Sequence, residues 1–553
     1  MEEEIFVLRN KTLGQLLDET IGRFPEVEAL VHAEKNIRLT WSEFGRDVDR
    51  LAKGLLALGV RRGDKIGVWA TNVPCWVPLM FASARIGAVL VTVNTSYQAH
   101  ELEYLLRQSE CEYLFMIDIY RDHDFLNILR EVLPEIDSLP RDGLVCARLP
   151  HMRRIVCFNG APLPSLYSMD DVMDMAESIS GIEYEAAKSQ TRPEDVVNMQ
   201  YTSGTTGFPK GVMLTHVNIL NNGYWIGRHQ KFTSQDRICL PVPLFHCFGC
   251  VLGVMAIVNH GCTMVLIDAF NPVQVLTALD RERCTGVYGV PTMFLSILEY
   301  KNFARYNLSR LRTGIMAGSV CPAPLMRRVI KEMNMREITI CYGLTEGSPV
   351  MTQTRADDDF ERKVTTVGRA LPGIDVRVIS PETGREMPRG QPGEVVCAGY
   401  NIMKGYYNMP EETAQVIDAD GRLHTGDLGI MDKEGYLTIT GRIKDMIIRG
   451  GENIYPIEIE EFLSGMEGVL DVQVVAVPSY KYGEEVAAFI IPKAGVALTP
   501  KDVRDHCRGN IAWHKVPRHI AFVGSFPLTG SGKIQKFKLR EMAVRMFAED
   551  ESG

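Results

Sequence analysis

Residues 201–211 read Tyr-Thr-Ser-Gly-Thr-Thr-Gly-Phe-Pro-Lys-Gly, a run of hydroxyl side chains and glycines that ends in a lysine. Glycines allow backbone conformations that a Cβ resists, so main-chain N–H groups can converge on an anion while Ser203 and the threonines add donors. Lys210 supplies a mobile positive charge. The run therefore predicts a loop that holds phosphate, although it lacks the GxxxxGK[ST] pattern of P-loop NTPases. A flexible linker is the alternative, disfavoured because the apolar segments 196–199 and 212–214 predict flanking strands.

Further short motifs follow along the chain, and most combine glycine with charged, aromatic or hydroxyl residues. They are Cys-Tyr-Gly-Leu-Thr-Glu at 341–346, Tyr406, His-Thr-Gly-Asp at 424–427, Gly-Arg-Ile-Lys-Asp at 441–445, Gly-Gly-Glu-Asn at 450–453 and Gly-Ser-Gly-Lys at 530–533. With the phosphate loop, their order and spacing resemble the adenylate-forming superfamily, which includes acyl-CoA synthetases, aryl-CoA ligases, luciferases and peptide-synthetase adenylation domains. The resemblance extends over nearly the whole chain.

The chemistry of that family explains why such residues are needed. A carboxylate is a poor acylating agent, and attack on the α-phosphate of ATP converts one of its oxygens into part of a mixed anhydride. The reaction must neutralise several oxygens at once, which requires cations, a metal and fixed donors. By resemblance, Lys533 bridges the substrate carboxylate and the α-phosphate, Thr345 donates to a phosphate, and Glu346 holds Mg²⁺, which prefers oxygen ligands.

The resemblance also assigns the nucleotide pocket. Tyr342 would stack on adenine, Asp427 would accept both ribose hydroxyls, and Arg442 would contact ribose or phosphate; singly, each also fits an ordinary structural role. The expected ATP- and AMP-binding set is Thr202, Ser203, Gly204, Thr205, Thr206, Lys210, Gly318, Ser319, Cys341, Tyr342, Gly343, Thr345, Asp427, Arg442 and Lys533. Cys341 departs from the family, because many members have glycine before the tyrosine.

For the second half-reaction the thiol of CoA, the cosubstrate, must reach the acyl carbonyl. Gly450 and Gly451 look like the glycine pair that lets pantetheine pass close to the backbone. In the family this happens after the C-terminal domain turns about a hinge, which falls on Lys444 here. A plain turn between a strand and a helix is the alternative for the two glycines.

Two positions bear on which acid is activated. His246 lies where acyl-CoA synthetases carry a histidine near the carboxylate, and residues 243–249 lack the aspartate that amino-acid-activating relatives need. Gly343 stands where acetate-specific relatives have a tryptophan, so the pocket should be deeper. The expected pocket walls are Tyr224, Trp225, His246, Val290, Met293, Ala317, Ser319 and Gly343. Medium- to long-chain fatty acids therefore fit best, and 344–349 resembles the medium-chain subgroup.

Three alternatives stay open at this point. Apolar and aromatic walls suit an aryl ring as well as an alkyl chain, so the protein could be an aryl-CoA ligase. It could load a separate carrier protein, or bind acyl-adenylates without catalysis. An acceptor test with ATP and acids of increasing length separates these classes.

Composition limits the class of protein further. The 553 residues exceed the ~250 to 300 at which single cores stop growing, so at least two domains are expected. A net charge of −9 argues against a nucleic-acid partner. The acidic N-terminus does not resemble a secretory signal, and no apolar run approaches the ~18 residues of a membrane span. A cytoplasmic enzyme with small-molecule partners is expected, and a homodimer stays open.

The 13 cysteines are scattered singly, which suggests buried apolar residues more than a disulfide framework. Cys247 and Cys250 form a CxxC after His246. A zinc site would need a second ligand pair at similar spacing, and none is present. These two cysteines are therefore expected to line a pocket wall.

The elements that would position these residues follow from hydrophobic periodicity. Thr12 is predicted to begin a helix, and Thr40 with Glu43 forms a capping box. Strands alternate with helices, which indicates parallel pairing in doubly wound sheets. The predicted strands are 65–69, 88–93, 113–116, 237–243, 262–267, 286–289 and 313–317, and the helices 77–86 and 100–108.

From about residue 372 the pattern changes to short β-rich segments at 376–379, 393–398 and 435–440, which suggest a β-barrel-like subdomain. After Lys444, an α+β unit is predicted with helices 456–464 and 500–510 and strands 472–477, 486–491 and 519–523. The predicted fold is α/β, with a large N-terminal AMP-binding domain (1–443) of doubly wound sheets and a small mobile α+β C-terminal domain (444–553) that carries Lys533.

Overall fold

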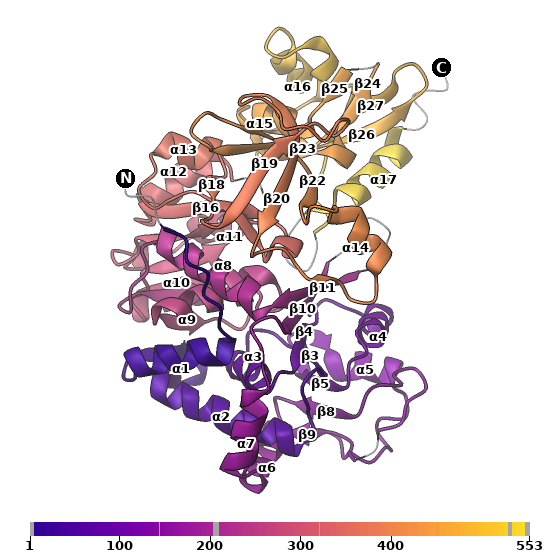
Figure 1. Ribbon diagram of the computed structural model, residues 1–553. Helices are drawn as coiled ribbons and strands as arrows, with labels where there is room; N and C mark the ends of the chain where they lie inside the picture. Colours follow the sequence, from indigo (N-terminus) through magenta and orange to yellow (C-terminus); the bar gives the residue numbers. More distant parts are fainter. Residues whose placement is uncertain are drawn as a thin grey trace. The chain divides into compact units, whose positions relative to one another are not determined.

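The computed structural model describes residues 5–142, 144–202, 209–319, 321–450, 452–528 and 534–547 (Figure 1). The chain divides into two compact units. The first comprises Met1–Val376 and Cys397–Leu423, and the second Arg377–Val396 and His424–Gly553. No division point falls at Lys444, and the hinge at that residue stays a prediction.

The first unit contains two large sheets. In the eight-stranded sheet the order is β21-β11-β10-β4-β3-β5-β8-β9, and the strands from β10 to β9 pair in parallel. The bounds are β21 Gly405–Tyr406, β11 Lys210–Thr215, β10 Val196–Thr202, β4 Val89–Thr92, β3 Lys65–Trp69, β5 Tyr113–Met116, β8 Arg154–Cys157 and β9 Tyr167–Ser168. The antiparallel edge made by β11 and β21 carries the phosphate-loop stem.

The nine-stranded sheet has the order β18-β17-β16-β15-β14-β12-β13-β1-β2, parallel from β16 to β1 and antiparallel at both edges. The bounds are β18 Arg369–Ala370, β17 Val350–Gln353, β16 Glu337–Gly343, β15 Thr313–Met316, β14 Gly286–Gly289, β12 Arg237–Leu240, β13 Thr263–Leu266, β1 Glu28–His32 and β2 Ile37–Thr40. Both sheets confirm the predicted doubly wound α/β architecture.

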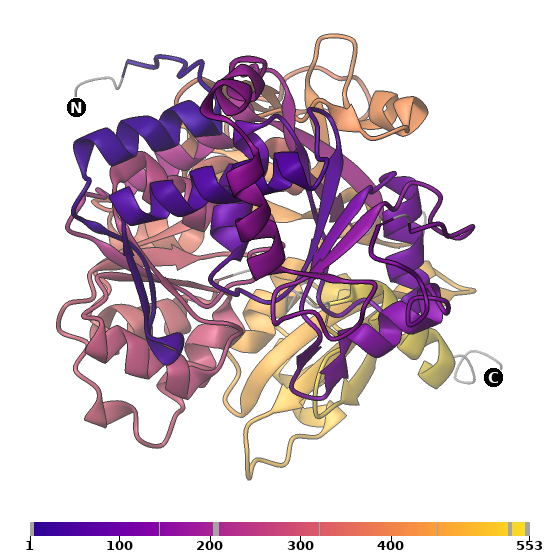
Figure 2. The ribbon, with the colours of Figure 1, turned by 90° about the horizontal axis from the view of Figure 1, so that it is seen from below.

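Helix starts in this unit follow the local signals in the sequence. Thr12 caps α1 (Leu13–Arg23) and Thr40 caps α2 (Trp41–Ala57), each with a complete capping box. The two helices pack beside one another, as the indigo ribbons in Figure 2 show. Helices α3 (Trp76–Arg85) and α4 (Ala99–Gln108) lie within two residues of their predicted bounds.

Two elements are shorter than predicted. Strand β12 ends at Leu240, because Pro241 and Pro243 lack the N–H that would continue the ladder. Helix α16 (Pro500–Cys507) ends where the backbone of Arg508 becomes extended. Lys210 is also placed differently, since it begins strand β11 and does not lie in the loop.

In the β-rich region, four strands form one sheet in the order β19-β20-β22-β23. Their bounds are β19 Ile374–Ile379, β20 Pro392–Gly399, β22 Leu423–Met431 and β23 Leu437–Arg442. The boundary between the units passes through the first three of these strands.

The rest of the second unit is an α+β layer, as predicted. Long strands β26 (Val469–Ser479) and β27 (Gly483–Pro492) pair antiparallel, and alternate side chains enter a core on each face. The remaining elements are β24 Ile447–Arg449, β25 Glu452–Ile454, β28 His519–Phe522, α15 Pro456–Ser464 and α17 Lys536–Phe547.

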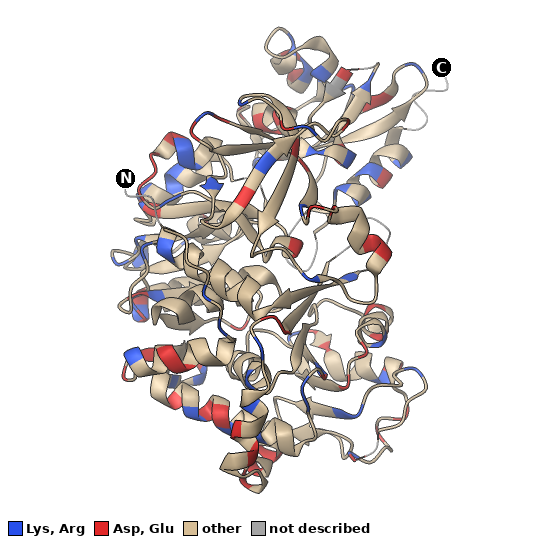
Figure 3. Ribbon diagram, viewed as in Figure 1, with Lys and Arg blue, Asp and Glu red and all other residues tan. Residues whose placement is uncertain are grey.

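Acidic and basic residues are interspersed along the helices and loops of both units (Figure 3). Within the described ranges, no helix is both long enough and apolar enough to cross a bilayer.

Candidate active site

The stem of the predicted phosphate loop is a β-hairpin in the first unit. Strands β10 and β11 pair antiparallel, and Thr202 lies opposite Lys210. The predicted donors between them, Ser203, Gly204, Thr205 and Thr206, lie outside the described residues. The hairpin therefore places the lysine at the point where the loop begins and ends.

Lys210 is buried, and its ammonium nitrogen lies 5.0 Å from the centre of the Tyr406 ring. Strand β21 pairs with β11, and the Tyr407 N–H donates to the Gly211 carbonyl (2.8 Å). These backbone bonds fix the aromatic ring against the lysine. Among the residues that the structure describes, no carboxylate forms an ion pair with Lys210.

Thr345 and Glu346 lie in a buried 3₁₀ turn, Thr345–Gly347. The Tyr406 hydroxyl donates a 2.8 Å hydrogen bond to Glu346 Oε1. Burial, followed by the negative charge of Glu346, raises the pKa of Tyr406, so the hydroxyl keeps its proton. The Met403 N–H donates to the Glu346 carbonyl, which anchors the turn as well (2.9 Å).

The histidine loop contacts the same turn. Thr345 Oγ1 lies 3.8 Å from Cys247 Sγ, which in turn lies 3.6 Å from Nδ1 of His246. The Phe248 N–H donates to His246 Nδ1 (3.2 Å), so a neutral imidazole there carries its proton on Nε2. The structure thus brings together His246, Thr345, Glu346 and Lys210, which are scattered over 137 positions of sequence.

The two cysteines of the CxxC motif are not joined by a disulfide. Cys250 Sγ accepts a hydrogen bond from Gln200 Nε2 (3.0 Å), while Cys247 faces Thr345. Burial raises the pKa of Cys250, which makes it a poor thiolate ligand. Across the described ranges, no cluster of three or more His, Cys, Asp or Glu side chains could hold a metal. A pocket-wall role for both cysteines stays a prediction.

Gly343 has a steric reason to be glycine. A Cβ at this position would lie 1.7 Å from the Pro349 carbonyl oxygen. That glycine at this position leaves the acid pocket deeper stays a prediction. A Gly343→Trp exchange would, however, displace backbone. Loss of long-acid activity in such a variant would not by itself measure pocket volume.

Other residues predicted to line the nucleotide and acid pockets lie mainly at strand ends. Ala317 N–H donates to the Gly289 carbonyl (3.3 Å), and a Cβ on Gly318 would approach Val290 Cγ1 at 3.1 Å. The carboxyl ends of neighbouring parallel strands β14 and β15 thus meet here, as ligand-binding residues do in open α/β sheets. Cys341 follows in β16, and burial raises the pKa of its thiol.

Helix α8 (His216–His229) carries Tyr224 and Trp225, which are predicted to line the acid pocket. Trp225 is buried, whereas Tyr224 is partly exposed and packs against the guanidinium of Arg9 and the ring of His260.

Three buried asparagines of α8, which sequence reasoning missed, each hold a different segment. Asn218 Nδ2 donates to the Tyr400 carbonyl (2.5 Å), Asn221 bonds the backbone of Arg9, and Asn222 Nδ2 donates to the Val350 carbonyl (2.7 Å). The sequence did contain a sign of this role. Asparagine is a poor helix former, so three asparagines within five positions of one helix suggest that their side chains are needed for other contacts.

In the second unit, Asp427 and Arg442 lie opposite each other on β22 and β23. Arg442 Nε donates to Asp427 Oδ1 (3.0 Å), and the guanidinium is about half exposed. Lys444 lies in the following 3₁₀ turn, Ile443–Asp445, where burial and then the charge of Arg442 lower its pKa.

Gly450 directly follows β24. Its φ of +61° is a left-handed conformation that glycine adopts readily, and its N–H donates to the Tyr482 carbonyl (2.8 Å). Arg449, just before it, pairs with the fully buried Glu485 (Nε to Oε2, 2.8 Å). The predicted residues Gly451 and Lys533 lie outside the described part of the chain.

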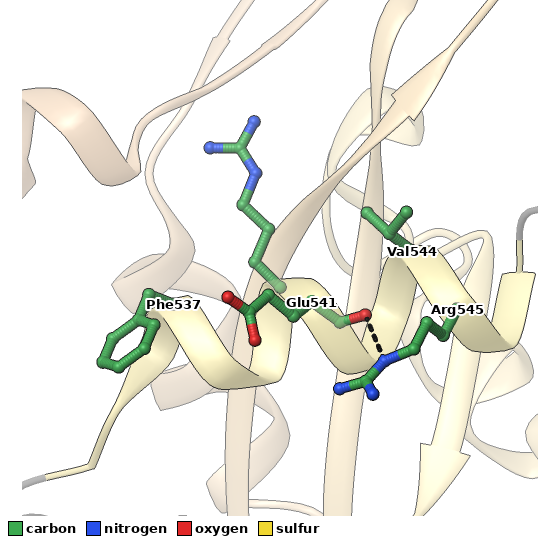
Figure 4. A pocket seen from close by; sticks show the side chains of 5 residues that line it. Phe537, Glu541, Val544 and Arg545 are labelled. Atoms are coloured by element: carbon green, nitrogen blue, oxygen red, sulfur yellow. Dashed lines mark hydrogen bonds between the residues drawn. The ribbon is translucent and has the colours of Figure 1, made fainter. Parts of the chain in front are cut away.

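A hollow along α17 is unrelated to these residues. Its lining comes from one helix, and Arg545 Nε donates to the Glu541 carbonyl (3.3 Å; Figure 4). No residue predicted to do chemistry takes part in the lining, which is Phe537, Arg540, Glu541, Val544 and Arg545.

Comparison with known proteins identifies the family. Residues 17–407 match the model of the AMP-binding enzyme family, and residues 458–533 match that of the AMP-binding enzyme C-terminal domain. The chain is 49% identical to the putative acyl-CoA synthetase YngI of Bacillus subtilis (98% of both chains covered). It is 42% identical to the mitochondrial medium-chain acyl-CoA ligase ACSF2 of Rattus norvegicus (97% of this chain, 88% of that protein).

Among solved structures, the anthranilate CoA ligase AuaEII in complex with anthranoyl-AMP superimposes with a TM-score of 0.85. The two proteins are 25% identical, and the match covers 99% of this chain and all of the other. The sequence matches and the fold match agree. The chain therefore belongs to the AMP-binding enzyme family, among the AMP-forming acyl-CoA synthetases, whose reaction uses ATP and CoA.

Proposed function

We propose that this acyl-CoA synthetase activates a medium- to long-chain fatty acid. The carboxylate attacks the α-phosphate of ATP, the bond to pyrophosphate breaks, and acyl-AMP forms; the CoA thiol then displaces AMP to give acyl-CoA. The observation that supports a single site for both substrates is the contact between the His246 loop and the Thr345 turn. That contact brings the group expected at the carboxylate next to those expected at the phosphates.

During adenylation, negative charge on the phosphate oxygens must be stabilised in the transition state. Lys210 suits this task because it lies at the loop stem without an ion-pair partner among the described residues. Thr345 would donate to a phosphate oxygen, and Lys533 would bridge the two substrates.

Mg²⁺ fits Glu346, because this ion takes one or two protein carboxylates and completes its shell with phosphate oxygens and water. The Tyr406 hydrogen bond uses one of the two carboxylate oxygens and sets the orientation of the group. When bound there, the ion would neutralise charge on the phosphates. Asp427 and Arg442 would contact the ribose.

In the second half-reaction, the Gly450–Gly451 turn would line the path of pantetheine. The absence of a side chain lets a narrow thiol arm approach the backbone closely. Domain movement about Lys444 would exchange Lys533 for this turn.

A panel of saturated acids, with benzoate and anthranilate included, tests the substrate class. Acyl-AMP formation is followed by pyrophosphate release, and transfer is followed with CoA or without an acceptor. Highest kcat/KM on a fatty acid supports the proposal. If kcat/KM is highest for an aryl acid, the second candidate function, an aryl-CoA ligase, is favoured. The fold match to an anthranilate CoA ligase is the observation that supports this candidate.

Lys533→Ala separates the two steps. It should slow acyl-AMP formation by at least ~10²-fold, since the ammonium acts chiefly in the transition state. Transfer from preformed acyl-AMP to CoA should survive. Equal loss in both steps would show that Lys533 is structural.

A further inference from the structure

The segment before α1 lies as a strap, residues 5–12, along helix α8. The Arg9 N–H donates to Asn221 Oδ1 (2.9 Å), and Asn221 Nδ2 donates back to the Arg9 carbonyl (3.1 Å). Asn221 is fully buried, so this pair of bonds is shielded from water. At the end of the strap, the Leu13 N–H donates to Nδ1 of the buried His216 (3.0 Å), the first residue of α8.

The side chain of Arg9 adds two more attachments. Its Nη1 donates to Asn259 Oδ1 (2.9 Å), and its guanidinium lies 4.7 Å from the centre of the Tyr224 ring. The strap is therefore bonded to α8 and α9 (Ala256–His260) at several points in its own unit.

Among the apolar residues of the strap, Phe6 is the one that is partly buried, whereas Ile5, Val7 and Leu8 are exposed. The Phe6 ring stacks on Tyr400 at a centroid distance of 5.4 Å, with planes 9° apart, and lies 6.4 Å from the ring of Trp225. A Cβ on Gly373 would come within 2.5 Å of the Phe6 ring, so the ring fills the space up to that backbone. By contrast, Ile5 is 85% exposed and Val7 is 69% exposed.

Trp225 connects Phe6 to the acid pocket of the proposed function. The indole is only 4% exposed, and its Nε1 has no hydrogen-bond partner among the described residues. An acyl tail that extended to this indole would find the Phe6 ring directly behind it.

The other neighbour of Phe6 leads to the catalytic turn. Tyr400 is followed by Asn401, whose Nδ2 donates to the Gly347 carbonyl beside Glu346 (3.0 Å). Phe6 thus lies between the expected tail wall and the loop that holds the turn.

We propose that Phe6 limits the length of the acyl chain that the enzyme accepts, by closing the space behind Trp225. The inference rests on the proposed fatty-acid function and adds to it a specificity-determining residue in a segment outside the 17–407 family match. Removal of the ring would leave an apolar space between Tyr400, Trp225 and Gly373. Such spaces stay dry and admit apolar groups.

The test compares Phe6→Ala with Ile5→Ala, a matched change one residue away on the exposed side of the same strap. Acyl-AMP formation is measured by pyrophosphate release for saturated acids that differ by two carbons. The readout is the ratio of kcat/KM for the acid two carbons longer than the wild-type optimum to kcat/KM for the optimum itself. We expect this ratio to rise about tenfold or more in Phe6→Ala, because one methylene in an apolar pocket changes discrimination by about that much. Ile5→Ala should leave the ratio unchanged.

Phe6→Leu keeps part of the volume and guards against a folding defect, which thermal unfolding would detect. It should move the ratio in the same direction by a smaller factor. Two outcomes overturn the inference and leave the proposed function intact. One is an unchanged ratio in a folded Phe6 variant, and the other is an equal fall of kcat/KM for all acids. If the wild type forms no acyl-AMP from any fatty acid, the proposed function fails and this inference fails with it.

Discussion

Two hairpins, β10–β11 in the first unit and β24–β25 in the second, each carry a cation at the strand end next to the connecting loop. Lys210 is buried against the Tyr406 ring, and no described carboxylate pairs with it. Arg449 is also largely buried, but two of its nitrogens reach Glu485, which is completely inaccessible to solvent. Both cations are removed from water, yet among the described residues a carboxylate neutralises only Arg449.

The difference indicates two roles. A buried charge normally has an opposite charge or strong hydrogen bonds, because desolvation is expensive. Arg449 satisfies that rule within the fold and is a structural support for the Gly450 turn. Lys210 departs from it, which is reasonable where an anionic ligand supplies the missing charge.

The largest effect should come from Arg449→Met. This change would leave Glu485 buried with Arg518 (3.6 Å) as its remaining ion-pair partner among the described residues, so the free energy of unfolding of the second unit should fall by about 3 kcal/mol or more. Denaturant titration followed by circular dichroism measures this. The double variant Arg449→Met with Glu485→Met should recover most of the loss. If the single variant is as stable as the wild type, the pair is not a structural support.

Lys210→Met tests the other half of the comparison. Acyl-AMP formation should fall by about 10²-fold, since one charge that stabilises the transition state is lost. The free energy of unfolding should change by less than ~1 kcal/mol, because no ion pair is broken. Pyrophosphate release and denaturant titration measure the two quantities. A large loss of stability with unchanged activity would reverse the roles assigned to the two cations.

Tyr406→Phe separates the two contacts of Tyr406. It keeps the aromatic ring next to the Lys210 ammonium and removes only the hydrogen bond to Glu346. Hydrogen bonds to charged groups contribute about 1.5 to 3 kcal/mol, so acyl-AMP formation should slow by about tenfold or more and need more Mg²⁺. In a Glu346→Gln background, which itself should weaken Mg²⁺-dependent catalysis, the same change should add little. Fully additive losses would mean that Tyr406 acts on another group.

The last prediction concerns His216, which is buried, and His260, which is partly buried; among the described residues no carboxylate is hydrogen-bonded to either ring. Burial lowers the pKa of His216 and of His260 to about 4. The unfolded chain takes up protons below about pH 6.5 and the folded chain does not, so stability must fall as the pH drops from 6.5 towards 4. Each histidine should contribute about 1.4 kcal/mol per pH unit. Denaturant titrations across this range check the slope, and His216→Gln should reduce it; an unchanged slope in that variant would contradict the assignment.

Much of this protein could be predicted from local sequence, because the responsible interactions span only a few residues. Thr12 and Thr40 mark helix starts because a hydroxyl satisfies an N–H three positions on. Strands β3, β5 and β14 have their predicted bounds, since short apolar runs are enclosed by turn residues. The order of the motifs was likewise sufficient to indicate adenylate chemistry.

Tertiary structure alone decided which groups meet. Glu346 and Tyr406 are 60 positions apart and come together because β21 adds to the edge of β11. Phe6 reaches Tyr400 because the bonds from the strap to Asn221, Asn259 and His216 hold it against α8 and α9. Gly343 is required by the Pro349 carbonyl, a contact set by the irregular register of β16 and β17. Such pairings depend on sheet order, register and packing over long sequence separations, and no local pattern of residues encodes them.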